Sequence, residues 1–265
     1  FGGDTDMATF VQRLAGYSAC GMVTHHVLPF LHGGGGNGKS VFLDVLLSVL
    51  GDYASTAPAG FLMAGAKDDE NAVARLSGLR LVVCSEVNQS ARFDEAKVKI
   101  LTGGDRLTAR FLYQRHFTFA PTHTLWLMGN HQPRVGAGGE SFWRRLRLLP
   151  FTVKVPDSKR VEGLAAQLAE AEGPGILAWV VRGAVEAAQK GLQEPAAVLA
   201  ATKEYAEEED SLARFVADAE AHSLRMAAVD KTDPYGRQIE RQSSICHAKA
   251  QGAPVGNCWL WPDET

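Results

Sequence analysis

Short apolar runs bounded by glycine or polar residues recur through the first 155 residues of the chain. Three of them have the length and composition of buried β-strands: Val27–Leu31, Leu79–Cys84 and Thr124–Met128. Buried strands that alternate with helical stretches are typical of a parallel sheet in an α/β protein. Pro29 is unusual in the first run, because proline removes a hydrogen bond from the ladder of a central strand.

The segments between these runs have the periodicity of helices. We expect a helical lead-in within residues 1–26, a buried helix after residue 40 and a helical region from residue 156 onward. Several of these segments open with polar residues and close at glycine, as capped helices do. The helices expected after the lead-in are Val41–Leu50, Asp68–Leu76, Phe93–Thr102, Pro195–Glu209 and Ser211–Leu224, and a further strand is expected at Leu148–Val153.

One segment, Arg106–Pro121, alternates between side-chain types and is interrupted by Gln114, Arg115 and His116. This pattern predicts a β-hairpin with a basic tip. A basic tip beside aromatic residues is suited to the phosphates and bases of single-stranded DNA. An ordinary solvated hairpin turn explains the same residues equally well.

The segment between the first strand and the first core helix carries the clearest chemistry. It matches the phosphate-binding pattern G-x-x-x-x-G-K-[ST] at every fixed position, with a strand before it and a helix after it. Glycines let backbone N–H groups curl around phosphate oxygens, the lysine supplies a positive charge, and the hydroxyl can bind Mg²⁺. The loop consists of Gly33, Gly34, Gly35, Gly36, Asn37, Gly38, Lys39 and Ser40.

Two polar residues end the other predicted strands. Glu86 follows the second strand and Asn130 follows the third. Ligands of open parallel sheets bind at the carboxyl ends of the strands, so Glu86 can activate the water that attacks the γ-phosphate and Asn130 can hold that water. A solvated glutamate and a turn asparagine are the alternatives. Arg144 and Arg145 can neutralise a phosphate across a subunit boundary, or lie on the surface of a helix.

The composition is that of an ordinary globular protein. The chain has 265 residues, 46% of them hydrophobic and 22% charged, with a net charge of −3. Nucleic-acid binding would therefore need a local basic patch or an assembled ring. Four scattered cysteines argue against a disulfide framework and fit a reducing cytoplasm. No apolar run is long enough to span a bilayer, so we expect no membrane contact.

Several consecutive motifs resemble those of superfamily 3 helicases, and in particular the C-terminal helicase part of phage and plasmid primase-helicases. The most specific is Lys99-Ile100-Leu101-Thr102-Gly103-Gly104-Asp105, because phosphate loops are shared by many NTPases. The resemblance covers about residues 1–220. Its other segments are the phosphate loop with Phe30–His32, Leu79–Glu86, Leu125–Asn130, Phe142–Leu146 with Pro150-Phe151, and the region from Gly175 to Phe215.

The resemblance implies an α/β, AAA+-like P-loop NTPase with a mostly parallel central sheet, followed by a helical C-terminal region. ATP and Mg²⁺ would bind between the subunits of a homo-oligomeric ring, expected to be a hexamer. Lys39, Ser40, Glu86 and Asn130 would lie on one side, with Arg145, or as second choice Arg144, as a finger from the neighbour. Lys99 and the hairpin tip Gln114, Arg115 and His116 would contact single-stranded DNA in the channel.

The implied protein is an ATP-driven helicase of a phage or mobile element, working in the host cytoplasm and moving 3′ to 5′. The chain begins with Phe1 rather than Met, so we expect an upstream region, which in such proteins is a primase domain. The predicted parts are a lead-in at 1–26, a nucleotide-binding core at 27–155, a helical region at 156–224 and an irregular tail at 225–265.

The sequence departs from the family in two places. Ser85 precedes Glu86 where many relatives have paired acidic residues, so Mg²⁺ would depend on Ser40, phosphates and water, with Glu86 acting through water. The tail has none of the pattern of the winged-helix-like domain expected there, which suggests truncation or a shifted reading frame. Cys246, His247 and Cys258 in this tail fit no zinc spacing.

Two other classes of protein remain open at this stage. A ring-forming replication-initiation or assembly module would keep the phosphate loop and use hydrolysis only as a switch. A small-molecule kinase would need an acceptor pocket and a lid, and it would have no use for a basic hairpin or a finger from a neighbouring subunit.

Overall fold

The computed structural model describes residues 1–66, 69–85, 90–136 and 139–210. Phe1–Glu209 forms one compact unit. Its helices are α1 (Thr5–Cys20), α2 (Lys39–Leu50), α3 (Glu70–Ala74), α4 (Glu95–Leu101), α5 (Glu140–Trp143), α6 (Leu164–Lys190) and α7 (Ala196–Glu209). Its strands are β1 (Leu28–His32), β2 (Ala54–Thr56), β3 (Leu81–Ser85), β4 (Leu107–Ala109), β5 (Phe117–Phe119), β6 (Thr124–Gly129) and β7 (Leu146–Pro150).

Five of the strands form a parallel sheet in the order β2-β3-β6-β1-β7. This confirms the predicted α/β class and the mostly parallel central sheet. Pro29 lies inside β1 without disrupting it. The ladder between β1 and β6 begins at Phe30, one residue later, so the missing amide of Pro29 falls just outside that ladder.

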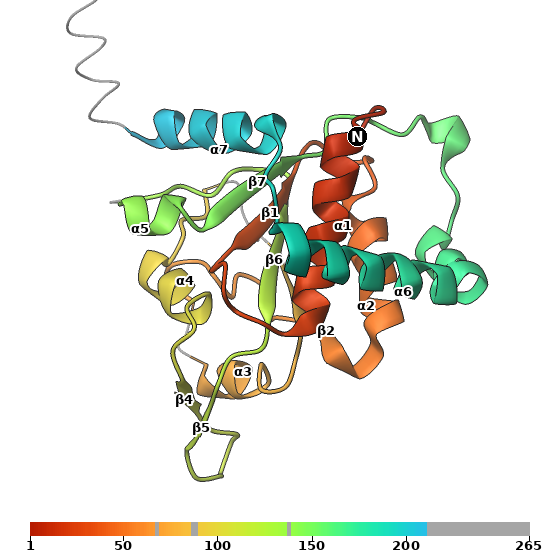
Figure 1. The fold of residues 1–265 in the computed structure, drawn as a ribbon. Helices are drawn as coiled ribbons and strands as arrows, with labels where there is room; N and C mark the ends of the chain where they lie inside the picture. The colour runs from red at the N-terminus through yellow and green to blue at the C-terminus, as the bar shows by residue number, and fades with distance from the viewer. Residues whose placement is uncertain (67–68, 86–89, 137–138, 211–265) are drawn as a thin grey trace, which may run out of the picture. The chain divides into compact units, whose positions relative to one another are not determined.

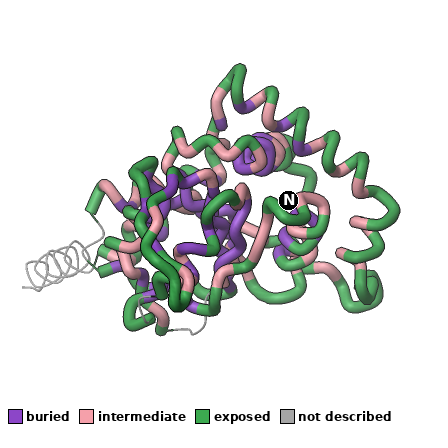
Figure 2. Tube along the Cα trace, turned by 90° about the horizontal axis from the view of Figure 1, so that it is seen from below, coloured by how far each residue is buried: buried purple, intermediate pink, exposed green. Residues whose placement is uncertain are grey.

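Helices cover both faces of the sheet (Figure 1). Successive side chains of a strand point to opposite faces of the sheet. Phe30 therefore belongs to the hydrophobic cluster under α3, α4 and α5, and Leu31 belongs to the cluster under α1, α2 and α6. The helix α7 reaches both, through Val198 in one cluster and Tyr205 in the other. Figure 2 shows the buried residues concentrated in the middle of the fold.

The helices α1 and α6, far apart in the sequence, cross in direct backbone contact. A Cβ placed on Gly16 would lie 2.0 Å from the backbone nitrogen of Ala184, and one on Gly183 would lie 2.0 Å from the carbonyl oxygen of Gln12. Only glycine allows this approach. A salt bridge of 3.0 Å between Arg13 and Glu186 joins the same two helices.

Some sequence predictions differ from the structure in detail. The strand expected at Leu148–Val153 is β7, which starts two residues earlier, because Leu146 pairs with the first residue of β1. It ends at Pro150, opposite His32, where β1 itself ends. The helix expected to be buried, α2, is buried at Leu43, Val45 and Leu46, but Val41 and Phe42 are only partly buried and line a cavity described below.

Among the described residues, no helix combines the length and the apolar character needed to cross a membrane. The predicted helix at Ser211–Leu224 and the predicted tail lie outside the described residues.

Candidate nucleotide site and hairpin

The predicted phosphate loop lies between the end of β1 and the start of α2. Gly33, Gly36 and Gly38 have positive φ values of 152°, 75° and 85°. A Cβ on Gly33 would lie 2.3 Å from the carbonyl oxygen of Phe151, so this position requires glycine on steric grounds as well. The loop is fastened from the following segment, because Asn37 Nδ2 donates to the Phe151 carbonyl at 2.8 Å and the Val155 amide donates to the Gly36 carbonyl at 2.8 Å.

Lys39 is buried within this loop, with 4% of its surface exposed. Its ammonium lies 2.6 Å from the Gly33 carbonyl oxygen, 3.0 Å from Asn37 Oδ1 and 3.1 Å from Asn130 Oδ1. These three acceptors are neutral oxygens, and they fix the position of the ammonium at the loop. A lysine held at a glycine loop in this way can contact an anion that binds there.

The loop runs directly into the amino terminus of α2. The helix has 12 residues, and Gly38 in the left-handed conformation forms its N-cap without a side-chain cap. Backbone N–H groups in the first turn of such a helix attract anions, as phosphate sites do. Ser40 is exposed in this first turn, where its hydroxyl lies 3.5 Å from Met128 Sδ.

Asn130 follows β6, and the pairing of His32 with Gly129 puts it at the same sheet edge as the loop. The contact between Lys39 and Asn130 brings this strand end against the loop. Glu86 follows β3, whose last residue Ser85 pairs with Met128. Glu86 itself lies outside the described residues. Beside this edge, His32 and Asn130–Gln132 line a hollow of about 370 Å³.

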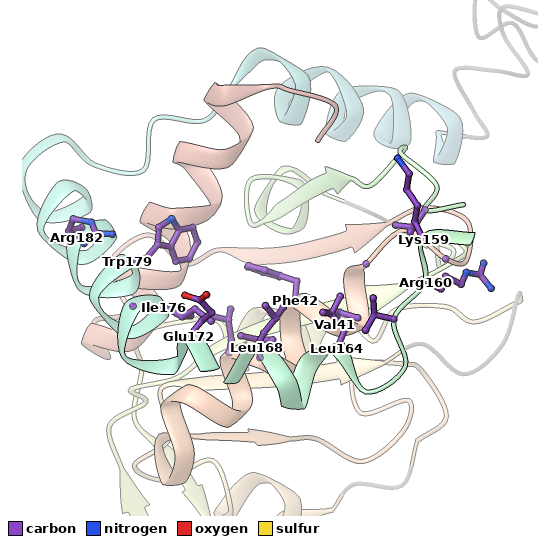
Figure 3. Close-up of a pocket in the computed structure, with 17 residues that line it drawn as sticks. Val41, Phe42, Lys159, Arg160, Leu164, Leu168, Glu172, Ile176, Trp179 and Arg182 are labelled. Carbon is purple, nitrogen blue, oxygen red and sulfur yellow. The ribbon is translucent and has the colours of Figure 1, made fainter. Parts of the chain in front are cut away.

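A larger cavity of about 860 Å³ begins at the loop and extends between α2 and α6. Figure 3 shows Phe42 and Leu168 pointing into it, with Trp179 towards one end and Lys159 and Arg160 towards the other. Gly36 and Gly38 of the loop line the cavity too. The loop end therefore carries two cations, and the end near Trp179 combines apolar side chains with Glu172 and Arg182.

Arg160 at the loop end of the cavity was not singled out from the sequence. A Cβ on Gly36 would lie 2.6 Å from an Arg160 guanidinium nitrogen, and Arg160 forms a salt bridge of 3.0 Å with Asp157. The placement depends on the segment after β7 folding back over the loop. A lone arginine in an irregular segment gives no sequence signal for that contact.

Arg144 and Arg145 lie at the opposite end of the sheet from the loop. The carbonyl of Arg145 accepts the amide of Leu28, the first residue of β1, at 2.7 Å. The strand then extends roughly 13 Å before the loop begins. These arginines are therefore placed away from the phosphate loop of their own chain.

The two arginines have different surroundings. Arg144 is exposed, whereas Arg145 is partly buried and donates to the carbonyl of Ser141. Burial lowers the pKa of the Arg145 guanidinium, and the neighbouring charge of Arg144 lowers it further. Arg144 is therefore the one that can reach another molecule without rearrangement.

The predicted hairpin is present as β4 and β5, which pair antiparallel and project away from the main sheet (Figure 1). Glu70 of α3 lies 2.6 Å from Arg110 Nε and 3.4 Å from His116 Nε2. His116 at the predicted tip is therefore held back towards α3, while Gln114 and Arg115 are exposed. Lys99 is partly buried in the last turn of α4.

The segment Lys99–Asp105 is connected to β6 through a buried histidine. His123 lies one residue before β6 begins, and its Nε2 donates to the carbonyl of Leu101 at 3.1 Å. Burial lowers the pKa of His123 to about 4, although the bond to the Leu101 carbonyl works in the opposite direction. The strand β6 ends at the sheet edge where the phosphate loop lies. His123 therefore connects α4, which precedes the hairpin, to the strand that ends at this edge.

The described residues contain no group of three His, Cys, Asp or Glu side chains able to hold a metal ion. A Mg²⁺ ion at the loop would be held by the Ser40 hydroxyl and by phosphate oxygens. This fits a cation that usually arrives with the phosphates of its nucleotide.

This chain is similar to known proteins in sequence and in fold. Residues 31–145 match the model of a family of unknown function, DUF5906. The chain is 29% identical over 154 residues to "Putative helicase L207/L206" of Acanthamoeba polyphaga mimivirus, with 57% of this chain and 16% of the relative covered. It is 31% identical over 126 residues to "Putative primase C962R" of African swine fever virus, with 46% and 13% covered. The chain thus spans less than a fifth of either relative.

The fold matches the A-form apo structure of the NrS-1 C-terminal region, with a TM-score of 0.64 at 14% identity. The match covers 95% of this chain and 63% of that structure. Together with the viral relatives, it confirms the resemblance predicted from the motifs. By sequence, this chain is similar to segments of viral proteins named as putative helicases and primases, and by fold it is similar to the NrS-1 C-terminal region.

Proposed function

We propose that the chain is the ATPase domain of a DNA helicase of phage or mobile-element replication. It hydrolyses ATP with Mg²⁺ at the subunit interfaces of a ring, and it moves along single-stranded DNA. The observation that carries this proposal is the placement of Lys39, which lies within 3.1 Å of both the glycine loop and Asn130. A loop, a helix terminus and a strand-end amide at one edge form the elements of a phosphoryl-transfer site.

In this proposal the phosphates lie on the loop and the base enters the cavity between α2 and α6. Apolar side chains of the cavity, among them Phe42 and Trp179, suit a flat purine ring, and Arg160 and Lys159 lie near the phosphate end. Lys39 and Arg160 stabilise the negative charge of the phosphates. Ser40 holds the Mg²⁺ ion, which supplies further charge stabilisation.

Asn130 orients the attacking water, and Glu86, the next residue in the sequence after β3, accepts its proton. The rate acceleration then comes chiefly from positioning and charge stabilisation.

The remaining positive charge comes from a neighbouring subunit. Arg144 and Arg145 lie at the other end of β1, so they can serve only the site of another chain. A head-to-tail ring makes that arrangement at every interface, and the proposed ring is a hexamer. Sequence reasoning favours Arg145 as the finger, and the exposure of Arg144 makes it the alternative to be tested.

The DNA-contacting part is the hairpin with Gln114, Arg115 and His116, together with Lys99 on α4. His123 links α4 to β6, and through β6 to Asn130, which gives a contiguous route between the DNA contacts and the nucleotide. The names of the viral relatives support a role in replication. An upstream primase domain and a location in the host cytoplasm belong to this proposal.

Steady-state ATP hydrolysis with and without single-stranded DNA tests the proposal. We expect hydrolysis that DNA stimulates several-fold and that Lys39→Ala abolishes. A nucleotide-switched assembly module would hydrolyse ATP slowly without stimulation. A small-molecule kinase would show turnover that depends on an added acceptor and not on DNA, and either result would refute the motor.

A further inference from the structure

The hairpin ends in two exposed hydrophobic residues that the sequence prediction of its tip did not include. Leu112 is 70% exposed and Tyr113 is 103% exposed, the two highest values among large hydrophobic side chains in the described part of the chain. They are consecutive and immediately precede Gln114. Adjacent exposed hydrophobic side chains at the end of a projecting hairpin form a candidate contact surface.

The base of the hairpin is well fixed, so the tip is presented at a defined place. The rings of Phe111 and Phe117 stack at 5.8 Å across the two strands. The hydroxyls of Thr108 and Thr118 lie 2.9 Å apart, and Glu70 binds both flanks of the tip through Arg110 and His116. These contacts leave residues 112–115 projecting.

The backbone of Tyr113 adds a separate observation. Its φ is 62°, in the left-handed region that a bulky residue rarely adopts. The amide of Gln114 donates to the carbonyl of Phe111 at 3.0 Å and closes the turn around it. Such a conformation costs free energy at a bulky residue, and residues of this kind cluster at functional sites.

The surrounding charges indicate the chemistry of that ligand. Arg106, Arg110 and Arg115 lie on the hairpin, and Arg115 forms no salt bridge among the described residues. An aromatic ring beside cations binds single-stranded nucleic acid, because bases stack on the ring and phosphates meet the cations.

We propose that Tyr113, supported by Leu112, stacks against the bases of single-stranded DNA, while Arg115 contacts the phosphates. This inference rests on the proposed function in taking DNA as the ligand, and it assigns the base contacts to residues outside the basic tip predicted from sequence. Stacking on Tyr113 is insensitive to base sequence, as a translocating protein requires.

Two oligonucleotides of equal length separate the roles, one of thymidines and one of abasic sites with the same phosphates. In the full chain, Tyr113→Ala should weaken binding of the thymidine strand about tenfold and leave the abasic strand unchanged, while Tyr113→Phe binds as the wild type does. Arg115→Ala should weaken both strands and lower the salt dependence by about one counterion.

Tyr53→Ala, which removes a 58% exposed tyrosine elsewhere, is the matched control and should have no effect. Equal effects of Tyr113→Ala on the two strands, or none on either, would overturn the stacking role while leaving DNA binding by the wild type intact. Loss of self-association in Tyr113→Ala, measured by light scattering, with unchanged DNA binding would assign the tip to a subunit contact instead. A wild type that binds neither strand would remove the proposed function as well.

Discussion

Lys39 and Asn130 are the pair of residues on which the nucleotide site depends most directly. They come from different elements, α2 and the end of β6, and their side chains lie 3.1 Å apart. The ammonium has other acceptors in Gly33 and Asn37, so it can stay in place when Asn130 is replaced. The two residues can therefore be distinguished experimentally.

Asn130→Ala should lower kcat for ATP about 10- to 100-fold with little change in nucleotide affinity, because the loop and Lys39 remain while the attacking water loses its partner. Turnover and binding of a fluorescent ATP analogue measure the two effects. Lys39→Ala, as the comparison variant, should lose both ATP turnover and nucleotide binding. Weaker binding with unchanged kcat in Asn130→Ala would assign Asn130 to binding alone.

His123 makes the stability of the fold sensitive to acid. Its pKa is lowered from 6.5 to about 4, so the unfolded chain binds this proton more readily than the folded one. The free energy of unfolding should therefore be unaffected by His123 above pH 6.5 and fall by roughly 3 kcal/mol as the pH drops from 6.5 to 4. Urea unfolding across this range measures the slope.

The variant His123→Gln provides the control for that slope. His123→Gln should flatten the slope, because the titrating group is gone. An equal slope in the wild type and in His123→Gln would show that another group is responsible.

The sequence predicted the residues of the loop and the position of Asn130 at the end of the strand beside it, because a motif and the ends of parallel strands have fixed geometry. It did not predict Arg160 or Tyr113. Arg160 reaches Gly36 through an irregular segment, and Tyr113 depends on a turn conformation that no local pattern specifies.

At the scale of elements, the crossing of α1 and α6 holds one wall of the proposed base cavity in place. Gly183→Ala should reduce the free energy of unfolding by about 1–3 kcal/mol, because the new Cβ would meet the Gln12 carbonyl. Gly175→Ala in the same helix has only the flexible Glu172 side chain nearby, at 4.0 Å, and should stabilise by about 0.5–1 kcal/mol. Equal effects in urea unfolding would contradict the close crossing.

The cavity between α2 and α6 should matter for the base and not for the phosphates. Leu164→Ser should weaken ATP binding about fivefold by removing apolar contact, and leave binding of tripolyphosphate unchanged. Isothermal titration with both ligands measures this, and Leu199→Ser, at an exposed position outside the cavity, is the control. If Leu164→Ser weakened the binding of ATP and of tripolyphosphate equally, the base would lie outside this cavity.

The helices and strands were predicted well where apolar runs are long. They were predicted less well where packing against other elements determines their ends or their burial. The strands β1, β3 and β6 were found from composition alone. The start of β7 was placed two residues late, since it is set by pairing with β1. The open face of α2 was taken as buried, because an apolar helix beside a cavity has the same pattern as one in a core.

At the scale of the whole molecule, the two halves of the proposed site lie at opposite ends of the sheet. The loop follows the carboxyl end of β1, and Arg145 contacts the first residue of that strand. One chain can therefore supply the loop of one site and the arginine of the next. An isolated subunit should then hydrolyse ATP poorly.

Mixing two inactive variants tests this account most directly. Lys39→Ala retains the arginines, while Arg145→Ala, or Arg144→Ala if that residue is the finger, retains the loop. In equal mixtures with single-stranded DNA, ATP hydrolysis should recover, since about a quarter of the interfaces then combine an intact loop with an intact arginine. Activity no higher than the sum of the separate variants, or full activity of both arginine variants alone, would contradict a site shared between subunits.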